Sequence, residues 1–269
     1  MNRWLFLDDG PAPGDENMAR DEFLFERAAR GAVVPVLRLY SFEPPAVTIG
    51  YHQNPEKILD GDAARADGLD CVRRITGGRA LLHDGELTYC VAAPSGFVHF
   101  GTSPGETHLR ISEALRAALR SIGVDAEISR GREHSPPNGM TPPCLCSVSR
   151  NELAVGGRKI AGSAQRKTAA AFLQHGSILV RPGSERIVKY VRGSWGSIGG
   201  RMTSIFEELD REPDTGALRS ALVKAFSETF DVEWEPLRFS ESDEAEVRLR
   251  ILAKRRESID MFAGEECCP

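Results

Sequence analysis

The sequence predicts an α+β or mixed α/β fold, because short β-rich runs lie close together as hairpins while helical segments are spaced irregularly between them. The clearest hairpin joins residues 152–155 to residues 158–161 through Gly156 and Gly157. The clearest helix lies between Gly105 and Gly123, where apolar residues recur at helical spacing. No Gly-x-Gly-x-x-Gly or Walker-type Gly-Lys-Ser/Thr motif follows a predicted strand, so a dinucleotide-binding fold is not indicated.

The composition is that of a globular protein of mixed charge. The chain has 269 residues, with 34 Lys and Arg against 39 Asp and Glu, and its formal net charge of −5 is spread along its length. Because basic residues are interleaved with acidic ones, we expect no nucleic-acid partner. The apolar stretch 4–7 is too short for a signal peptide or a membrane span, so the sequence predicts a cytoplasmic protein without membrane contact. In that setting the six cysteines are expected to be free thiols.

The N-terminal half is predicted to begin with turns and a helix and to continue with strands. Residues 8–14 contain Asp-Asp-Gly-Pro and Pro-Gly and are interpreted as a turn cluster. Apolar residues at helical spacing then predict a helix over about 15–30. Runs rich in β-branched and aromatic residues predict strands at 33–40 and 46–50. A helix is predicted over 60–67, and it is followed by strands at 71–75 and 86–92 around a glycine-containing turn.

The C-terminal half combines a long loop, the hairpin and helices. Residues 129–143 carry four prolines and two glycines and are interpreted as a long irregular loop that leads to Cys144. After the hairpin, the β pattern continues at 170–173 and 177–180. The rest is predicted to be mainly helical, with helices over 215–230 and 242–262.

The first stretch that could carry chemistry contains Arg73, Arg74, Gly77, Gly78 and His83. Paired glycines let a ligand approach the backbone, whose N–H groups can bind carbonyl or phosphate oxygens, and arginines suit anions. The alternative is a hairpin turn with surface arginines. A single histidine such as His83 is more often packed or solvated than catalytic.

The second stretch is Cys144-Leu145-Cys146. A cysteine that follows a proline-rich loop is a nucleophile, half of a metal site or an inert thiol. Zinc needs about four ligands at short paired spacing, and the ligands here, His134 with the two cysteines, fit that poorly. We therefore expect no metal site.

The third stretch contains Lys159, Gly162 and Ser163 and is followed by Gln174-His175-Gly176-Ser177. A solvated surface lysine is the usual interpretation of such a residue. Here Lys159 lies between apolar neighbours and small residues, which indicates a partly desolvated amine whose pKa can fall toward useful values.

Together these stretches resemble the lipoate-protein ligase and octanoyltransferase family. The motifs that carry the resemblance are Arg73-Arg-Ile-Thr-Gly-Gly-Arg-Ala-Leu-Leu-His83-Asp-Gly-Glu-Leu-Thr-Tyr, Gly157-Arg-Lys159-Ile-Ala-Gly-Ser-Ala-Gln, Leu173-Gln-His-Gly-Ser-Ile-Leu, Asn17-Met-Ala-x-Asp21-Glu and Ile49-Gly-Tyr-x-Gln53. The resemblance implies a catalytic domain like that of biotin- and lipoate-protein ligases, with a mixed, mostly antiparallel sheet flanked by helices. It places this domain at residues 1–235, with 236–269 as a C-terminal helical extension of the same domain.

Within the family, the chain looks most like the cysteine-dependent branch that moves octanoyl from acyl carrier protein to the lysine of a lipoyl domain, such as glycine cleavage H protein or an E2 subunit. Cys144 lies eight residues before Glu152 and fifteen before Lys159, as the cysteine of that branch does. The resemblance implies that Cys144 is the nucleophile and that Lys159 receives its proton, without ATP, metal or another cofactor. It implies substrate binding by Arg73, Arg74, Gly77, Gly78, His83, Gly162 and Ser163.

Two alternatives remain open at this stage. The segment 149–153 resembles ATP-dependent lipoate ligases, which make lipoyl-adenylate with ATP and Mg²⁺, whereas Arg79 stands where those ligases tend to have a third glycine. Ligases also commonly carry a further small C-terminal domain, which the helical C-terminal segment does not suggest. A non-catalytic carrier-binding protein would give no reason for a Cys/Lys pair.

Overall fold

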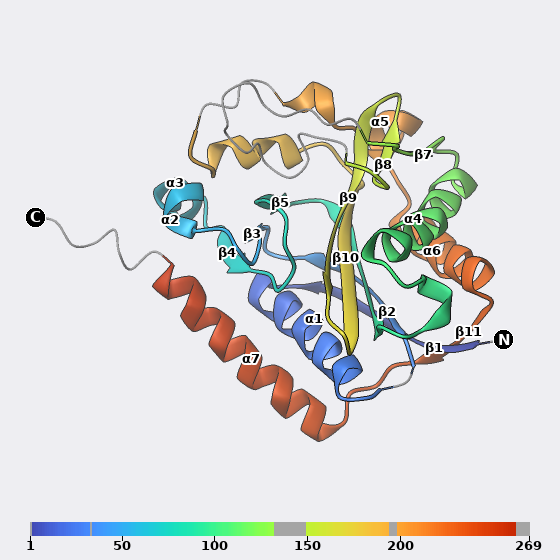
Figure 1. Cartoon of the computed structure of the whole chain (residues 1–269). Helices are drawn as coiled ribbons and strands as arrows, with labels where there is room; N and C mark the ends of the chain where they lie inside the picture. The colour runs from blue at the N-terminus through green and yellow to red at the C-terminus, as the bar shows by residue number, and fades with distance from the viewer. Residues whose placement is uncertain (1, 33, 132–148, 194–197, 262–269) are drawn as a thin grey trace, which may run out of the picture.

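The computed structural model describes residues 2–32, 34–131, 149–193 and 198–261, and its centre is an eight-stranded sheet (Figure 1). The strand order is β11-β1-β2-β6-β10-β9-β8-β7. Only the β11–β1 and β1–β2 pairs are parallel, and the other neighbours are antiparallel. The strands are β1 (Asn2–Ala12), β2 (Val36–Phe42), β6 (Glu86–Pro94), β7 (Glu127–Ile128), β8 (Leu153–Val155), β9 (Arg158–Lys167), β10 (Ala171–Leu179) and β11 (Val232–Pro236). This confirms the expected mixed, mostly antiparallel sheet.

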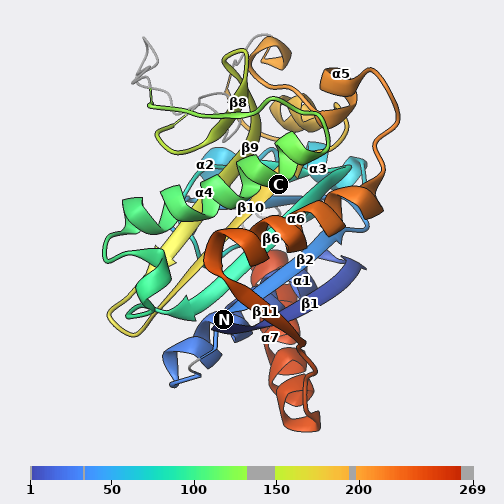
Figure 2. The same ribbon diagram turned by 90° about the vertical axis from the view of Figure 1, so that its right-hand side faces the viewer.

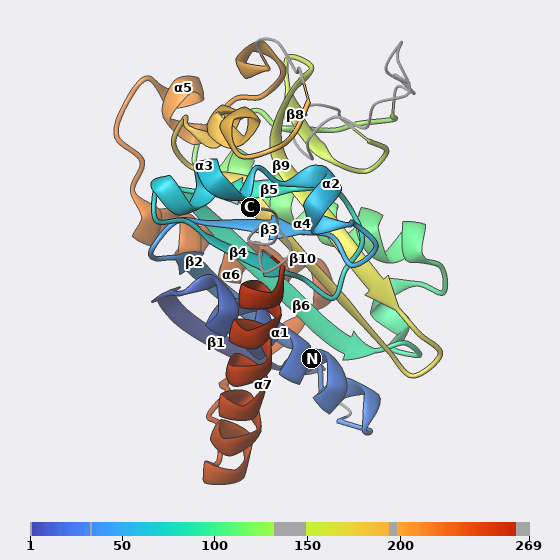
Figure 3. The ribbon, with the colours of Figure 1, turned by 90° about the vertical axis from the view of Figure 1, so that its left-hand side faces the viewer.

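A second, three-stranded sheet lies against one side of the large one (Figure 3). It has the order β4-β3-β5, formed by Asp70–Arg73, Ala46–Ile49 and Leu81–His83. Two short helices, α2 (Pro55–Ile58) and α3 (Gly61–Ala66), precede β4. The predicted turn between strands 71–75 and 86–92 therefore hides an additional strand, β5, and the two flanking strands belong to different sheets.

Helices cover both faces of the large sheet (Figure 2). One face packs against α4 (Pro104–Ser121) and α6 (Thr215–Phe230) through a cluster of apolar side chains. The other face packs against α1 (Gly14–Ala29), which in turn contacts α7 (Glu241–Asp260). The remaining helical segments are α5 (Ile205–Leu209) and the 3₁₀ turns Val98–Phe100, Ser184–Lys189 and Gly199–Arg201.

The longer helices form where their local sequence predicts them. The α4 helix begins with a capping box, in which Ser103 accepts from the Glu106 amide while the Glu106 side chain accepts from the Ser103 amide. Its chain leaves the helix through Gly123, whose φ of +96° favours glycine. The α7 helix has a second capping box, formed by Ser240 and Asp243. The four predictions for α1, α4, α6 and α7 are thus confirmed.

The turn cluster predicted at residues 8–14 is wrong, because most of it belongs to β1. The register of β1 against β2 shifts between Asp8 and Gly10, and Gly10 has a φ of +66°. A β-bulge of this kind lets one residue with positive φ stand inside a strand. The prediction that the chain after residue 180 is mainly helical also misses β11, which pairs with β1.

The C-terminal segment joins the rest of the molecule through α7. Its Arg250 contacts Glu26 of α1, and its Glu257 accepts from Arg73 at the end of β4. The predicted division between residues 235 and 236 falls within β11 and stays a prediction. Within the described ranges, no helix has both the length and the apolar character needed to cross a bilayer.

Candidate active site

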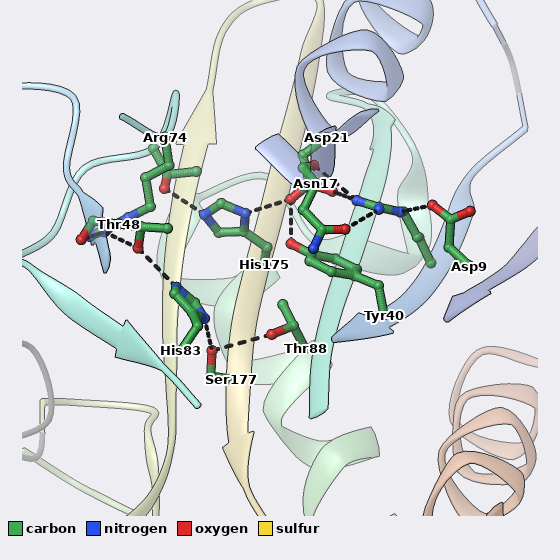
Figure 4. A network of polar contacts seen from close by, with 12 residues as sticks. Asp9, Asn17, Asp21, Tyr40, Thr48, Arg74, His83, Thr88, His175 and Ser177 are labelled. Carbon is green, nitrogen blue, oxygen red and sulfur yellow. Dashed lines mark hydrogen bonds and ion pairs between the residues drawn. The ribbon is translucent and has the colours of Figure 1, made fainter. Parts of the chain in front are cut away.

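A small pocket lies between the two sheets, and Figure 4 shows several of the side chains that line it. Its floor is the large sheet, from Tyr40 of β2 to Gly162 of β9. Its other walls come from α1 and the small sheet. The remaining lining residues are Met18, Thr48, Arg74, Leu81, His83, Thr88, Ser163, Ala164, His175, Gly176 and Ser177.

His175 of β10 is held at both ring nitrogens. Nδ1 lies 2.7 Å from a carboxylate oxygen of Asp21, and Nε2 lies 2.7 Å from the hydroxyl oxygen of Thr76. Burial lowers the pKa of His175 below 6.5, and Asp21 only partly opposes this. Because an ionised carboxylate can only accept, Nδ1 of the neutral ring donates to Asp21 and Nε2 accepts from Thr76.

Asp21 is the centre of a buried polar network on α1. It accepts hydrogen bonds from Arg38 at 2.7 Å and from Tyr40 at 2.7 Å, in addition to His175. Burial acts to raise the pKa of Asp21, but the bond from His175 and the charge of Arg38 outweigh it and lower the pKa below 3.8. Arg38 also donates to Asp9 at 2.8 Å, so this buried guanidinium lies between two carboxylates.

His83 of β5 has a similar arrangement on the opposite side of the pocket. Its Nδ1 lies 2.7 Å from Glu86, its Nε2 lies 2.9 Å from the Thr48 hydroxyl, and its ring stacks on Phe42 at 3.9 Å. The structure therefore places His83 in the pocket wall and also packs it tightly. The packed histidine expected from the sequence is confirmed, a solvated one is wrong because His83 is buried, and its role in substrate binding stays a prediction.

The guanidinium groups of Arg73 and Arg74 donate to protein oxygens, and a role of either residue in substrate binding stays a prediction. Arg73 donates to the backbone carbonyls of Gly50, Tyr51 and Gln53 and to Glu257. The interpretation of both as surface arginines is wrong, since Arg74 is buried.

The Arg74 guanidinium supports the glycine turn from within. It donates to the carbonyls of Thr48, Gly77 and Arg79. At Gly78, whose φ is +92°, a Cβ atom would lie 2.7 Å from an Arg74 nitrogen. Glycine is required there both for backbone conformation and for space.

Gly162 and Ser163 line the pocket from β9, whereas Lys159 of the same strand does not belong to the lining. Ser163 Oγ lies 2.7 Å from the hydroxyl of Tyr89. Lys159 is 1% exposed, and its Nζ donates to Glu152 Oε1 at 2.7 Å. The solvated surface lysine considered from the sequence is therefore wrong, and desolvation of this amine is confirmed.

The cysteine predictions fall largely outside the described residues. Cys144, Cys146 and His134 lie there, as do Cys267 and Cys268. Burial raises the pKa of Cys71 to about 12 and that of Cys90 well above 9, so neither thiol readily becomes a nucleophilic thiolate. Within the described part of the chain, no cluster of three or more His, Cys, Asp or Glu is placed to hold a metal ion.

Asp21, Thr76 and His175 occur in the family motifs, but none of them was predicted from the sequence to be a site residue. The available signal was a histidine, normally polar, at the centre of the apolar run of β10. A buried histidine needs partners for both ring nitrogens, but their identity depends on contacts across 154 and 99 residues of sequence.

Comparisons with known proteins point to one family. Residues 13–227 match the model of the lipoyl protein ligase A/B catalytic domain. The chain is 37% identical over 262 residues to a protein named octanoyltransferase LipM from Symbiobacterium thermophilum, covering 93% of this chain and 95% of that protein. It is 33% identical over 253 residues to another octanoyltransferase LipM, from Moorella thermoacetica, covering 91% of this chain and 93% of that protein.

A solved structure shows the same fold. The crystal structure of lipoate-protein ligase A bound with ATP superimposes with a TM-score of 0.78 at 25% identity, covering 93% of this chain and 94% of that chain.

Proposed function

We propose, because this chain belongs to the lipoyl protein ligase A/B catalytic domain family, that it is an octanoyltransferase of protein lipoylation. In this proposal it takes octanoyl from acyl carrier protein and transfers it to the lysine of a lipoyl domain, of the H protein or E2 type. The observation that carries the proposal is the likeness to octanoyltransferases over nearly the whole chain.

The pocket is suited to an acyl chain. Leu81, Met18, Ala164 and Gly162 contribute carbon surface to its walls. An eight-carbon chain gains about 0.8 kcal/mol for each methylene that leaves water, so contact with this carbon surface favours its binding.

The proposed reaction has two steps. The Cys144 thiolate attacks the thioester carbonyl of octanoyl-phosphopantetheine, the carrier's thiolate leaves, and octanoyl is held on Cys144 as a new thioester. The neutral amine of the acceptor lysine then attacks that carbonyl, an amide forms as the C–S bond breaks, and the proton lost by the amine passes to the departing Cys144 sulfur. Aminolysis of a thioester is downhill, so this sequence of steps needs neither ATP nor a metal ion.

Lys159 is proposed as the group that receives the proton of Cys144. It lies on β9 three residues before Gly162, outside the pocket lining, and its amine is paired with Glu152. Glu152 in turn accepts from the Ser149 amide at 2.6 Å, which fixes the carboxylate. A neighbouring ammonium favours the thiolate form of a cysteine. The glycine turn and the Gly162-Ser163 backbone are proposed to donate to the developing oxyanion.

The test is transfer to an apo lipoyl domain from octanoyl-acyl carrier protein without ATP or Mg²⁺. We expect the acceptor to gain one octanoyl group, and we expect free octanoate and free lipoate to be inactive as donors. Modification that requires ATP and free acid would instead identify an ATP-dependent lipoate ligase. The likeness to the ATP-bound lipoate-protein ligase A is the reason to test this alternative.

A matched pair of cysteine variants tests the nucleophile. After incubation with octanoyl-acyl carrier protein alone, the intact mass of the Cys146→Ala variant should rise by one octanoyl group, and that of Cys144→Ala should not. An acyl group that is retained only when Cys146 is present would contradict the assignment of Cys144.

A variant of Lys159 tests the proton acceptor. Lys159→Ala should reduce transfer by orders of magnitude, about 10²- to 10⁴-fold for loss of a general base. Circular dichroism and the thermal unfolding midpoint report whether the variant is folded. Near-normal turnover in a folded variant would remove Lys159 from the mechanism.

A further inference from the structure

Four strands place one residue each in a single row across the floor of the pocket. In the register of the large sheet, Tyr40 is opposite Thr88, Thr88 is opposite Ser177, and Ser177 is opposite Gly162. All four residues line the pocket. We call this set the cross-strand row.

The side chains of the row lie on the same face of the sheet. The hydroxyls of Thr88 and Ser177 are 3.4 Å apart, and the hydroxyl of Tyr40 reaches Asp21 of the helix that covers this face. Figure 4 shows Tyr40, Thr88 and Ser177 following one another from β2 to β10. Their size decreases in that order and is smallest at Gly162, so the floor of the pocket becomes lower toward β9.

The two ends of the row differ. At the β2 end, the buried Tyr40 ring is fixed by its bond to Asp21 and by the Arg38 guanidinium 3.8 Å from the ring centre. At the other end, β9 pairs with β8 only as far as Ala161, so within the described residues no strand covers the outer edge of β9 at Gly162. The row therefore runs from the fixed Tyr40 ring at β2 to Gly162 at β9, where the described residues add no further paired strand.

We propose that the cross-strand row sets the length of the acyl chain that this protein accepts. The carbonyl end of the chain lies at Gly162, and the methyl end stops at Tyr40. Three intervals between neighbouring strands give the row a length of about 14 Å. The inference rests on the proposed function, since it assumes that the pocket holds an acyl chain.

The physical basis of the selection is the fixed position of the Tyr40 ring. A chain that is too long meets a side chain that cannot move without breaking the bond to Asp21. A chain that is too short leaves part of the pocket unfilled and loses about fourfold in binding for each missing methylene. The kcat/KM for transfer should therefore be highest at one acyl chain length and should fall for both shorter and longer chains.

Two substitutions move the preference in opposite directions. Thr88→Leu raises the floor in the middle of the row, so transfer of octanoyl should fall by at least about fifteenfold relative to hexanoyl, the factor for two methylenes. Met18→Ala removes a lining side chain that packs in the same core cluster as Tyr40, so decanoyl should gain relative to octanoyl. The measurement is kcat/KM for hexanoyl-, octanoyl- and decanoyl-acyl carrier protein.

Ala92→Val is the matched control. Ala92 lies on β6 four residues after Thr88, is buried in the cluster on the same face, and does not belong to the pocket lining. The added methyl groups test the effect of extra volume in this strand, and the order of preference should stay that of the unmodified protein. If Thr88→Leu does not fold, Met18→Ala still tests the row from the opposite direction.

The outcomes separate this inference from the proposed function. Active variants of Thr88 and Met18 with the unmodified order of chain lengths would overturn the role of the row. If the unmodified protein transfers no acyl group from any thioester, the proposed function fails, and the row is then judged by calorimetric binding of hexanoic, octanoic and decanoic acids. The same order of affinity in the unmodified protein and both variants would overturn the inference there as well.

Discussion

The two faces of the large sheet are built from alternate residues of the same strands, yet they differ in chemistry. Leu37, Leu39 and Leu87 point into an apolar cluster with α4 and α6. Their neighbours Arg38 and Thr88 point to the opposite side, where α1 supplies buried carboxylates and the small sheet closes a pocket. Because successive side chains of a strand alternate between faces, one set of strands provides an apolar core on one side and a polar site on the other.

The polar face is stabilised in a different way from the apolar face. Its charges are each matched by a partner: Arg38 by Asp9 and Asp21, and Asp21 in addition by His175 and Tyr40. Removing one member of such a network costs more free energy of unfolding than a single ion pair contributes, because the charge that remains is buried without a partner. The apolar face is stabilised instead by burial that is spread over many side chains.

The largest effect is expected from removing the central cation of the polar face. Arg38→Met leaves Asp21 buried without its positive partner, and the free energy of unfolding should fall by about 3–5 kcal/mol. Urea denaturation measures this loss. A change below about 1 kcal/mol would show that the polar face tolerates an uncompensated carboxylate and that the contrast between the faces is overstated.

The next residue in the chain gives the matched experiment on the apolar face. Leu39 is fully buried in the cluster with α4 and α6. Leu39→Ala should lower the free energy of unfolding by about 2–5 kcal/mol through lost burial and a cavity. The preference for acyl chain length should not change, because Leu39 lies on the side away from the pocket. A shifted preference would mean that the two faces are coupled.

A smaller effect is expected from the pH dependence of the polar face. The pKa of His175 in the folded protein lies below 6.5, so its contribution to stability is present above pH 6.5 and is lost as the pH falls through the lowered value. His175→Gln keeps a donor and an acceptor but does not titrate. Just below pH 6.5, the free energy of unfolding of this variant should fall less steeply with decreasing pH, by up to about 1.4 kcal/mol per pH unit. Equal slopes for both proteins would contradict this assignment.

The smallest effects should be equal on the two faces. Ser103 caps α4 on the apolar side and Ser240 caps α7 on the polar side, each in a capping box. Ser103→Ala and Ser240→Ala should each cost about 1 kcal/mol in thermal or urea unfolding. A clearly larger cost at Ser240 would indicate that α7 contributes to the polar network beyond its own helix.

Sequence reasoning succeeded where the signal is local. The α6 helix, predicted over 215–230, is observed as Thr215–Phe230, because its apolar spacing and its Asp214 cap lie within the segment itself. It failed at β1, where Asp8 and Gly10 look like turn residues but are accommodated by a bulge between two neighbouring strands. Strands of three to five residues, such as β5 and β11, carry too few positions for a periodic pattern.

The candidate site also combines features with a local sequence signal and features that depend on long-range contacts. The glycine turn, the hairpin that carries Lys159, the longer helices and the family motifs can be predicted from the sequence, because each depends on residues close together in the chain. That Tyr40, Thr88, Ser177 and Gly162 form one row, and that Asp21 meets His175, depends on how distant strands and helices pack. Shifting a strand by one residue would turn every side chain to the opposite face, so the pairing between distant strands selects the face.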